Sequence, residues 1–495
     1  MYRKHKFSII LIFFVVLSGC AGVRPRPAAK SYEESGCRTL FNELDEIIEQ
    51  AKTSDSQAAR IEHFPNLRID RFLASFRDNI ADREAFQFWY GQLQLLDSQA
   101  RLLEIKNTPK SLLVRLANNL EDPDELANEL EKCSSILRKT DLNSQNRATK
   151  LIEKAKVLDD YSNLKRVLGF YYLTRFFVSA GIAELNYSVA KRFQQSLESI
   201  PKKGKWVYFT PPKRIDPISS EEIRLILQKT SMNPLRIPLL SELQKEKIFR
   251  KYAPIWEIDI ATDEDRIGTP YWSTLDASAI DTSKPRTYKH LSYSRFNDDI
   301  LLQLNYVIWF PSRPVTGVFD LFGGHLDGIT WRVTLGTDGH PVFYDSIHNC
   351  GCYHMFFPGR GIQLRQQTEQ TEEPIRSIDA EIDEETLVVL RIASGTHYIQ
   401  KVYSRRSILN GNSYSLAEYD ELRSISYPDE DVHRSMFGTD SLVSGTTRKE
   451  RWILWPMGIL SPGAMRQWGH HATAFVGRRH FDSTDLFDRY FVKTD

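Results

Sequence analysis

Residues 329–347 read ITWRVTLGTDGHPVFYDSI, and this stretch decides the fold class of the chain. Apolar and polar side chains alternate on both sides of Asp338 and Gly339, and Asp-Gly between two alternating runs is a strong short-range signal for a β-hairpin. With these two residues at the turn, the register of an antiparallel pair is fixed. The predicted pairs are Leu335 with Val342, Trp331 with Ser346, and Ile329 with His348.

Strand-like runs continue on both sides of this hairpin. In 302–308 large apolar residues occupy every second position, and 387–392 is another short apolar run. Such runs between turn residues are typical of a β-sandwich. We therefore predict an α+β protein whose residues 290–495 form a β-rich, antiparallel sandwich domain with an irregular tail after about residue 420.

The open end of the hairpin gathers polar side chains. Extending the same register sets Asp327 opposite Cys350 and His325 opposite Cys352, and opposed residues point to the same side of a sheet. Because side chains alternate, His348 and His354 share that face, and Trp331 belongs to an apolar floor beside them. The alternation thus predicts a polar site on an apolar floor, with Trp331 placed to contact a ligand.

Imidazole, carboxylate and thiolate groups are the usual protein ligands of zinc and similar divalent metals. The candidate metal ligands are His325, Asp327, His348, Cys350 and Cys352, and the candidate general bases are His354 and His397. Two other interpretations stay open, namely a catalytic Cys-His pair and histidines that only satisfy hydrogen bonds in the core. Cys-x-Cys between two histidines matches no known zinc motif.

Histidine is concentrated in this domain: ten of the twelve histidines of the chain lie between His290 and His480. Isolated His290, His340 and His433 are expected to be structural. His470 and the adjacent His471 point to opposite sides of an extended chain, so at most one of them can join the site.

Five short segments of the domain together resemble a known group of proteins. They are LQLNYVIWFP at 302–311, GHLDG at 324–328, WRV at 331–333, YDSIH at 344–348 and SGTHY at 394–398. Their order is similar to that in the Vps62-related proteins, and the turn at 324–328 resembles the Gly-His-x-His-Asp-Trp-Glu turn of the necrosis-inducing toxin-like proteins. The resemblance covers about 110 of 495 residues and implies a β-sandwich.

In the toxin-like family the histidine, aspartate and glutamate of that turn surround a divalent cation. The resemblance implies the same role for His325 and Asp327. This chain has Arg332 where those families have glutamate, and we predict that His348, Cys350 or His397 supplies the missing ligand.

The N-terminal half has a different pattern. Apolar residues recur every three or four positions at Leu40, Leu44 and Ile47 and again at 113–120, which indicates amphipathic helices. We predict a helical domain over 38–200, in which the aromatic cluster at 170–172 packs in the core. Proline-rich residues 201–289 are predicted to be a connector.

Two interpretations of Cys37 and Cys133 stay open. In an oxidising compartment the two thiols can pair. Alternatively, Cys133 is a plain buried thiol, because it shares one helical stripe with Leu126, Leu130 and Leu137. Cys350 and Cys352 stand too close together in the chain for an easy mutual bridge.

The first twenty residues have the order of an export signal. Arg3, Lys4 and Lys6 precede an apolar run at 9–17 that is too short to span a bilayer. The run ends in Leu-Ser-Gly-Cys, which resembles the lipobox of bacterial lipoproteins. By that resemblance residues 1–20 are removed, Cys20 carries the lipid, and Ala21 rather than Asp implies the outer membrane. Residues 21–37 are then expected to be a flexible tether in the periplasm.

The composition narrows the function classes. A chain with 41 % hydrophobic residues and a net charge of +1 is an ordinary globular protein with no bias toward nucleic acid. It contains no Gly-x-Ser-x-Gly, phosphate-loop or dinucleotide motif in its proper context. Three functions stay open: a binding module for an unknown envelope ligand or protein, a metal-dependent hydrolase acting on an envelope component, and a purely structural lipoprotein.

Overall fold

The structure is a computed structural model. It describes residues 33–494 except 79, 81, 115, 117–122, 213–216, 275, 366–371, 381, 384–385, 408–410 and 428–431. The predicted signal at 1–20, lipidation at Cys20 and the tether up to residue 32 lie outside the described residues. Residues 34–37, predicted to belong to the tether, are already helical, because Cys37 is a buried member of the first helix.

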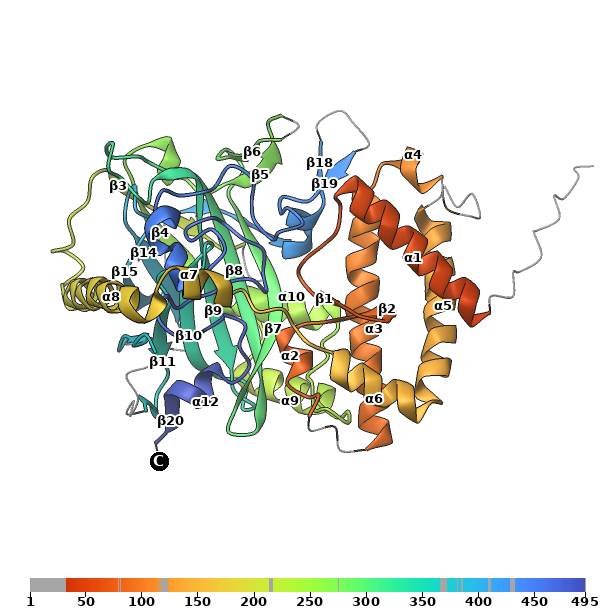
Figure 1. The fold of residues 1–495 in the computed structure, drawn as a ribbon. Helices are drawn as coiled ribbons and strands as arrows, with labels where there is room; N and C mark the ends of the chain where they lie inside the picture. The colour runs from red at the N-terminus through yellow and green to blue at the C-terminus, as the bar shows by residue number, and fades with distance from the viewer. Residues whose placement is uncertain are drawn as a thin grey trace, which may run out of the picture.

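The N-terminal part is a layer of helices (Figure 1). The long helices are α1 (Glu34–Ala51), α3 (Arg83–Asn107) and α5 (Pro123–Leu142), and the shorter ones are α2 (Arg71–Ala74), α4 (Lys110–Leu113) and α6 (Gln145–Lys154). A small hairpin of β1 (Ala59–Ile61) and β2 (Phe64–Ile69) packs against α3. The predicted stripe of Leu40, Leu44 and Ile47 is buried on α1, so the helical pattern there is confirmed.

A disulfide bond joins α1 to α5. Cys37 and Cys133 are bonded across 96 residues of sequence, and both are 0 % exposed. The structure therefore decides between the two interpretations of these cysteines in favour of the disulfide. The stripe of Leu126, Leu130 and Leu137 is buried around it, as the helical spacing predicts.

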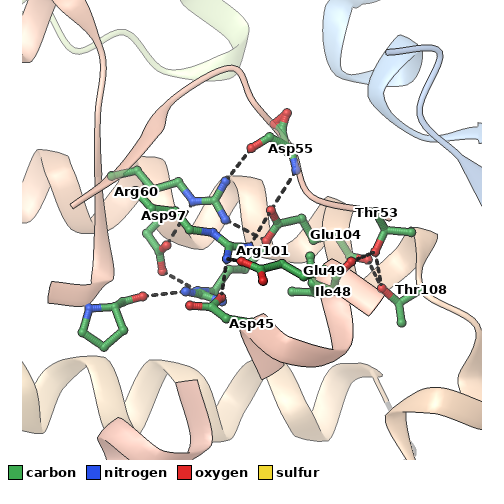
Figure 2. A network of polar contacts seen from close by, with 12 residues as sticks. Asp45, Ile48, Glu49, Thr53, Asp55, Arg60, Asp97, Arg101, Glu104 and Thr108 are labelled. Atoms are coloured by element: carbon green, nitrogen blue, oxygen red, sulfur yellow. Dashed lines mark hydrogen bonds and ion pairs between the residues drawn. The ribbon is translucent and has the colours of Figure 1, made fainter. Parts of the chain in front are cut away.

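A buried network of charges holds the helical layer together (Figure 2). Arg68 of β2, which is fully buried, bonds to Asp97 at 3.2 Å and to Glu104 at 2.7 Å on α3. Arg101 bonds to the other oxygen of Asp97 at 2.7 Å. Asp55 accepts a hydrogen bond from Gln467 at 2.6 Å, so this network also attaches the helical layer to the C-terminal part of the chain.

The C-terminal part contains two facing sheets, which confirms the α+β fold class (Figure 1). The larger sheet has the order β13-β11-β10-β9-β8-β7-β17 and the smaller one β15-β14-β4-β3-β16. The strands of the larger sheet are β7 (Arg286–Phe296), β8 (Asp299–Arg313), β9 (Gly324–Leu335), β10 (Pro341–His348), β11 (Met355–Pro358), β13 (Arg376–Ser377) and β17 (Ser415–Glu418). Those of the smaller sheet are β3 (Lys205–Thr210), β4 (Ile255–Ile260), β14 (Leu387–Ile392), β15 (Ile399–Arg405) and β16 (Asn412–Ser413).

Most neighbouring strands are antiparallel, but β11 with β13, β7 with β17, β4 with β14 and β3 with β16 run parallel. Large apolar side chains from both sheets meet in one core, including Trp256, Leu304, Trp331 and Leu390. The sandwich prediction is therefore correct in its layers, and the sheets are mixed rather than purely antiparallel.

The segment predicted to be a connector takes part in the sandwich. Residues 201–289 supply β3 and β4, so the smaller sheet begins well before residue 290. Pro211, Pro234 and Pro254 lie between elements, where they interrupt no ladder. The remaining elements of this segment are α9 (Ser220–Thr230), α10 (Glu242–Tyr252), η1 (Asp263–Asp265), β5 (Thr269–Trp272) and β6 (Ser278–Asp281).

Two helices leave the helical layer. These are α7 (Asn163–Leu168) and α8 (Tyr171–Phe193), and α8 lies at the end of the molecule opposite α1 and α5 (Figure 1). Helix α8 packs on the sandwich through Leu185, Val189 and Phe193. Among the described residues, no helix has both the length and the apolar composition that crossing a bilayer requires.

The expectation that the aromatic cluster at 170–172 packs in the core is wrong for two of its three residues. Phe170 and Tyr172 are 71 % and 77 % exposed, and only Tyr171 is buried. The exposed positions are apolar although they point away from the sandwich, so apolar composition alone does not indicate which side of this helix is covered.

The tail after residue 420 is irregular where the structure describes it, as expected. Its short elements are η2 (Tyr419–Arg423), β18 (Ile425–Ser426), β19 (His433–Arg434), α11 (Arg451–Leu454), η3 (Trp455–Met457), α12 (Leu486–Tyr490) and β20 (Phe491–Lys493). Strand β20 pairs with β12 (Ile362–Leu364), which precedes the tail. Tail backbone satisfies buried side chains: the Phe481 carbonyl accepts from Arg332 at 2.7 Å and the Thr484 carbonyl from Ser294 at 3.0 Å. The tail is thus part of the folded core.

Candidate functional site

The predicted hairpin is strands β9 and β10, and its register is confirmed over most of its length. Trp331 pairs with Ser346 and Ile329 pairs with His348. At the turn the register shifts, and Leu335 pairs with Pro341 rather than with Val342. The shift arises because the turn has more than two residues: Gly336 donates to the carbonyl of His340 at 2.8 Å.

Beyond His348 the ladder ends, and the extended pairing predicted there is wrong. The chain reverses, because Gly351 donates to the His348 carbonyl at 2.7 Å and His348 donates to the Cys352 carbonyl at 2.9 Å. Gly351 has φ of +93°, and a Cβ at this position would lie 2.6 Å from the Ala472 carbonyl oxygen, so the turn requires glycine. Cys350 and Cys352 therefore do not oppose Asp327 and His325.

The five predicted metal ligands do not converge. The His325 Nε2 atom lies 2.8 Å from the Ser278 carbonyl oxygen, and Cys350 packs in an apolar cluster. The hydrogen bond from Cys350, together with burial, raises the pKa of Cys352 well above its usual value, so this sulfur stays protonated. In the part of the chain that the structure describes, no three histidine, cysteine, aspartate or glutamate side chains are arranged to hold a metal ion. As described, these residues do not fit the divalent-cation site that the resemblance implies.

Trp331 is buried in the core and is not placed to contact a ligand. Its side chain is 0 % exposed and packs between Tyr344 and Phe357 in the core between the sheets. The alternation placed Trp331 on the correct face, but the smaller sheet covers that face.

Asp327 and His348 do meet, as the alternation predicts, in a buried network that also contains His397 and Asp265. The Oδ2 atom of Asp327 lies 2.8 Å from Nδ1 of His397, and its Oδ1 atom lies 3.4 Å from Nδ1 of His348. On its other side, Nε2 of His397 lies 3.6 Å from Asp265. Two carboxylates and two imidazoles thus alternate along one chain of contacts.

The backbone conformation around His397 places its ring in the network. His397 has φ of +52° at the end of the turn between β14 and β15, and its ring stacks on Phe310 with centroids 3.9 Å apart. Asp265 binds the same turn, accepting from Gly395 N at 2.6 Å and from the Ser394 hydroxyl at 3.0 Å. The network therefore fastens this turn to β8 and β9.

The electrostatics follow from burial and pairing. Burial favours the neutral forms, but the contacts with His348 and His397 hold the pKa of Asp327 well below its usual value. Burial also opposes charge on His397, yet its bonds to Asp265 and Asp327 raise its pKa. Burial lowers the pKa of His348. His397 is 0 % exposed and cannot reach a substrate, so the geometry gives it a structural role rather than the predicted catalytic one.

A cavity of about 450 Å³ lies next to this network, between α8, the turn at 351–354 and the C-terminal tail. One wall is apolar and comes from α8, with Phe177, Val178, Gly181, Ile182 and Leu185. The volume falls within the range of about 300–1,000 Å³ that is usual for small-molecule sites.

The opposite wall of the cavity is aromatic and polar. Tyr353 and Tyr398 lie in hydrogen-bond contact with each other, and both rings touch that of His348. Arg313 donates to the Tyr398 hydroxyl at 3.3 Å behind them. The tyrosine pair thus separates the cavity from the buried Asp-His network.

A partly satisfied cation lines the same cavity. Arg376 is 9 % exposed and donates to Asn186 of α8, but among the described residues its Nε atom has no hydrogen-bond partner. Burial lowers its pKa, although Glu373 nearby partly offsets that effect. A buried N–H without a partner costs about 1–3 kcal/mol, so the site favours a ligand that supplies an acceptor.

The second predicted base, His354, also lines the cavity. Its Nε2 atom lies 2.9 Å from Asp345, and its Nδ1 atom has no partner among the described residues. Burial lowers its pKa to about 4, and Asp345 is shared with Arg332. His354 is therefore neutral near pH 7.

Glu450 gives the cavity a pH dependence. Burial raises its pKa to about 7, against the opposing effect of Arg313, Arg448 and Arg466. Between its unfolded pKa of 4.5 and this value the folded protein binds the extra proton, so the free energy of unfolding falls as the pH rises through this window. We expect a fall of about 2–3 kcal/mol between pH 4.5 and 7 in wild type. Glu450→Gln should lack this part of the slope in urea unfolding at pH 5 and pH 7, and an unchanged slope would contradict the assignment.

Sequence reasoning missed Asp265, Tyr353, Arg313 and Arg376. Asp265 lies in the supposed connector, and the other three come from separate strands or loops. Tyr398 was within the SGTHY stretch of the resemblance, which was the one sequence signal that led to this region.

Comparison with known proteins found no matching family model, no significantly similar curated protein and no significantly similar solved structure. The resemblance to the Vps62-related and toxin-like families stays a prediction from short motifs.

Proposed function

We propose that this protein is a lipid-anchored envelope protein of a bacterial outer membrane that binds an amphiphilic ligand in the cavity under α8. The ligand has a single apolar chain and a small acidic head group. The observation that carries the proposal is the pairing of an apolar wall on α8 with the partly satisfied Arg376 in one cavity.

The two ends of the cavity suit the two ends of such a ligand. Phe177, Ile182 and Leu185 give an apolar chain a surface that excludes water. Arg376 offers a free N–H to a carboxylate or phosphate, and charge-assisted hydrogen bonds of this kind are the stronger ones. The cavity thus selects for both parts of the ligand.

Filling the cavity should abolish binding. Gly181 lines the cavity, and a Cβ there meets nothing within 4 Å, so Gly181→Phe adds a ring without a clash at its base. We expect it to weaken binding of a fluorescent long-chain fatty acid at least ~10-fold, since 1.4 kcal/mol of lost contact is sufficient. The protein is the lipid-free chain from Ala21, which contains every described residue. Ala183→Phe, on the exposed side of α8, is the matched control and should bind as wild type does.

The head group is tested separately. Arg376→Met should weaken binding of the fatty acid but leave binding of the fatty alcohol of the same chain length unchanged. If wild type binds neither compound saturably, the binding function is wrong and a structural lipoprotein is the better account. About one equivalent of bound transition metal, lost in His325→Ala and His348→Ala, would instead favour the metal hypothesis.

Hydrolysis is the second candidate function, and His354 is the observation that favours it. An Asp345-oriented imidazole with a free nitrogen on a cavity is the arrangement of a general base. The assay incubates the protein with a long-chain ester and measures the acid released. Release by wild type but not by His354→Gln would establish that function. Binding of the ester without turnover supports the binding module.

A further inference from the structure

Helices α7 and α8 expose an unusual number of large apolar side chains. Their exposed fractions run from 62 % to 82 %. The residues are Leu164, Val167, Leu168, Phe170, Tyr172, Leu173, Phe176, Phe177 and Tyr187. Single exposed apolar residues are normal, whereas a contiguous set on one pair of helices indicates a surface that something else covers.

Two neighbouring segments extend this surface around the mouth of the cavity. The loop between β8 and β9 exposes Val315, Val318 and Phe319, the last of these to 93 %, and the segment at α11 and η3 exposes Trp452, Ile453 and Trp455. The segments touch, since Lys449 donates to the Val318 carbonyl at 2.9 Å and Arg166 of α7 donates to the Met457 carbonyl at 2.8 Å. We call the exposed apolar residues of α7, α8, this loop and this segment the apolar collar.

The collar belongs to the mouth of the cavity. Phe177 of α8, Phe322 of the loop and Ile453 of α11 line the cavity and are themselves 82 %, 39 % and 56 % exposed. The same side chains therefore face the cavity and the solvent. Whatever covers the collar also covers the entrance.

Charge identifies the partner. Between Asn163 and Phe193 there are five basic residues and one acidic residue, Glu184, in a chain whose net charge is +1. The basic residues are Lys165, Arg166, Arg175, Lys191 and Arg192. Arg175 lies over the rings of Tyr172 and Phe176, so this cation stands among the aromatic side chains.

Exposed aromatic residues mixed with lysine and arginine are typical of protein surfaces that lie in the headgroup region of anionic bilayers. A second copy of this chain would bring the same positive charge against itself, which like-charge repulsion opposes. A membrane fits both the apolar and the basic character of the surface.

We propose that the apolar collar docks onto the surface of an anionic phospholipid bilayer, with α8 lying in the interface. Docked in this way, the mouth of the cavity opens onto the membrane, and an amphiphile passes between bilayer and cavity without crossing water. The docking itself rests on the exposed side chains and their charges and not on the proposed ligand.

The test is sedimentation of the lipid-free chain from Ala21 with vesicles. Wild type should bind vesicles of phosphatidylglycerol and phosphatidylethanolamine and bind phosphatidylcholine vesicles more weakly. Phe177→Ser combined with Phe319→Ser changes side chains that are 82 % and 93 % exposed, so the fold is kept while binding should fall by at least roughly 10-fold. Leu95→Ser combined with Leu102→Ser on α3 removes comparably apolar but distant exposed residues and should leave binding unchanged.

The charge is tested by Lys165→Glu combined with Lys191→Glu. These substitutions should reduce binding to the anionic vesicles and hardly affect binding to phosphatidylcholine. Equal binding by all variants, or no binding by wild type, would overturn the proposal. A dimer of wild type in sedimentation velocity that Phe177→Ser and Phe319→Ser dissociate would show that a second copy covers the collar.

The two proposals fail independently. Vesicle binding without saturable fatty-acid binding would overturn the cavity function and keep the docking surface. Fatty-acid binding without vesicle binding would overturn the docking surface and keep the cavity function.

Discussion

Asp327→Ala should lower the free energy of unfolding by roughly 3–5 kcal/mol, because it leaves a buried ion pair with one partner missing. The carboxylate of Asp327 lies 2.8 Å from Nδ1 of His397, whose ring is fully buried, and contacts His348 as well. Without it, only the longer 3.6 Å contact with Asp265 offsets a proton on His397 in the core, so that ring either loses the proton or holds it at a cost.

Urea unfolding at pH 7, followed by tryptophan fluorescence, measures this loss. Asp327→Asn keeps an oxygen that accepts a hydrogen bond, so its free energy of unfolding should lie between those of wild type and Asp327→Ala. Asp276→Ala removes a carboxylate that pairs with Arg434 on the surface, and such pairs contribute at most about 1 kcal/mol. If Asp327→Ala cost no more than this surface control, the network would not be a determinant of stability.

The disulfide between α1 and α5 should have an effect of similar size. Cys37→Ala combined with Cys133→Ala releases a loop spanning 96 residues of sequence, and loop-closure entropy assigns about 4–5 kcal/mol to a bridge of that length. The unfolded chain gains this freedom while the native contacts of both helices are largely kept. The urea midpoint of the double variant should therefore fall sharply.

Reductant supplies the matched control for this experiment. Dithiothreitol should shift the wild-type midpoint toward that of the double variant and leave the double variant itself unmoved. A wild type that is indifferent to reductant under conditions that reduce exposed disulfides in the unfolded state would contradict the assignment.

The parts of the fold that the sequence predicted are those that neighbouring residues decide. The β9–β10 register follows from alternation around one turn, and Trp331 and Ser346 do pair. The reversal at Gly351 brings the chain against the Ala472 carbonyl, and this close approach of a segment distant in sequence is not visible in any local pattern. In the same way, β4 pairs in parallel with β14, more than a hundred residues later, and proline-rich flanks hide it.

The site was harder to predict than the fold for the same reason. Asp327, His348 and His397 were all candidates, but Asp265 contacts His397 because it binds the turn at Ser394 and Gly395, which no sequence pattern indicates. Helix α8 posed a different difficulty, because the apolar residues that pack on the sandwich and those that are exposed are of the same types. Phe177 at 82 % exposure and Ile182 at 8 % are distinguished by burial alone.

The C-terminal tail has a consequence for synthesis of the chain. The last strand, β20, pairs with β12, and carbonyls of Phe481 and Thr484 complete bonds begun by Arg332 and Ser294 near the centre of the larger sheet. A chain that emerges with its N-terminus first has delivered the strands of both sheets before these partners arrive, so Arg332 lacks this acceptor until Phe481 is delivered. A chain that stopped before Phe481 would therefore leave both donors in the larger sheet without their carbonyl partners, and we expect quality-control proteases to degrade it.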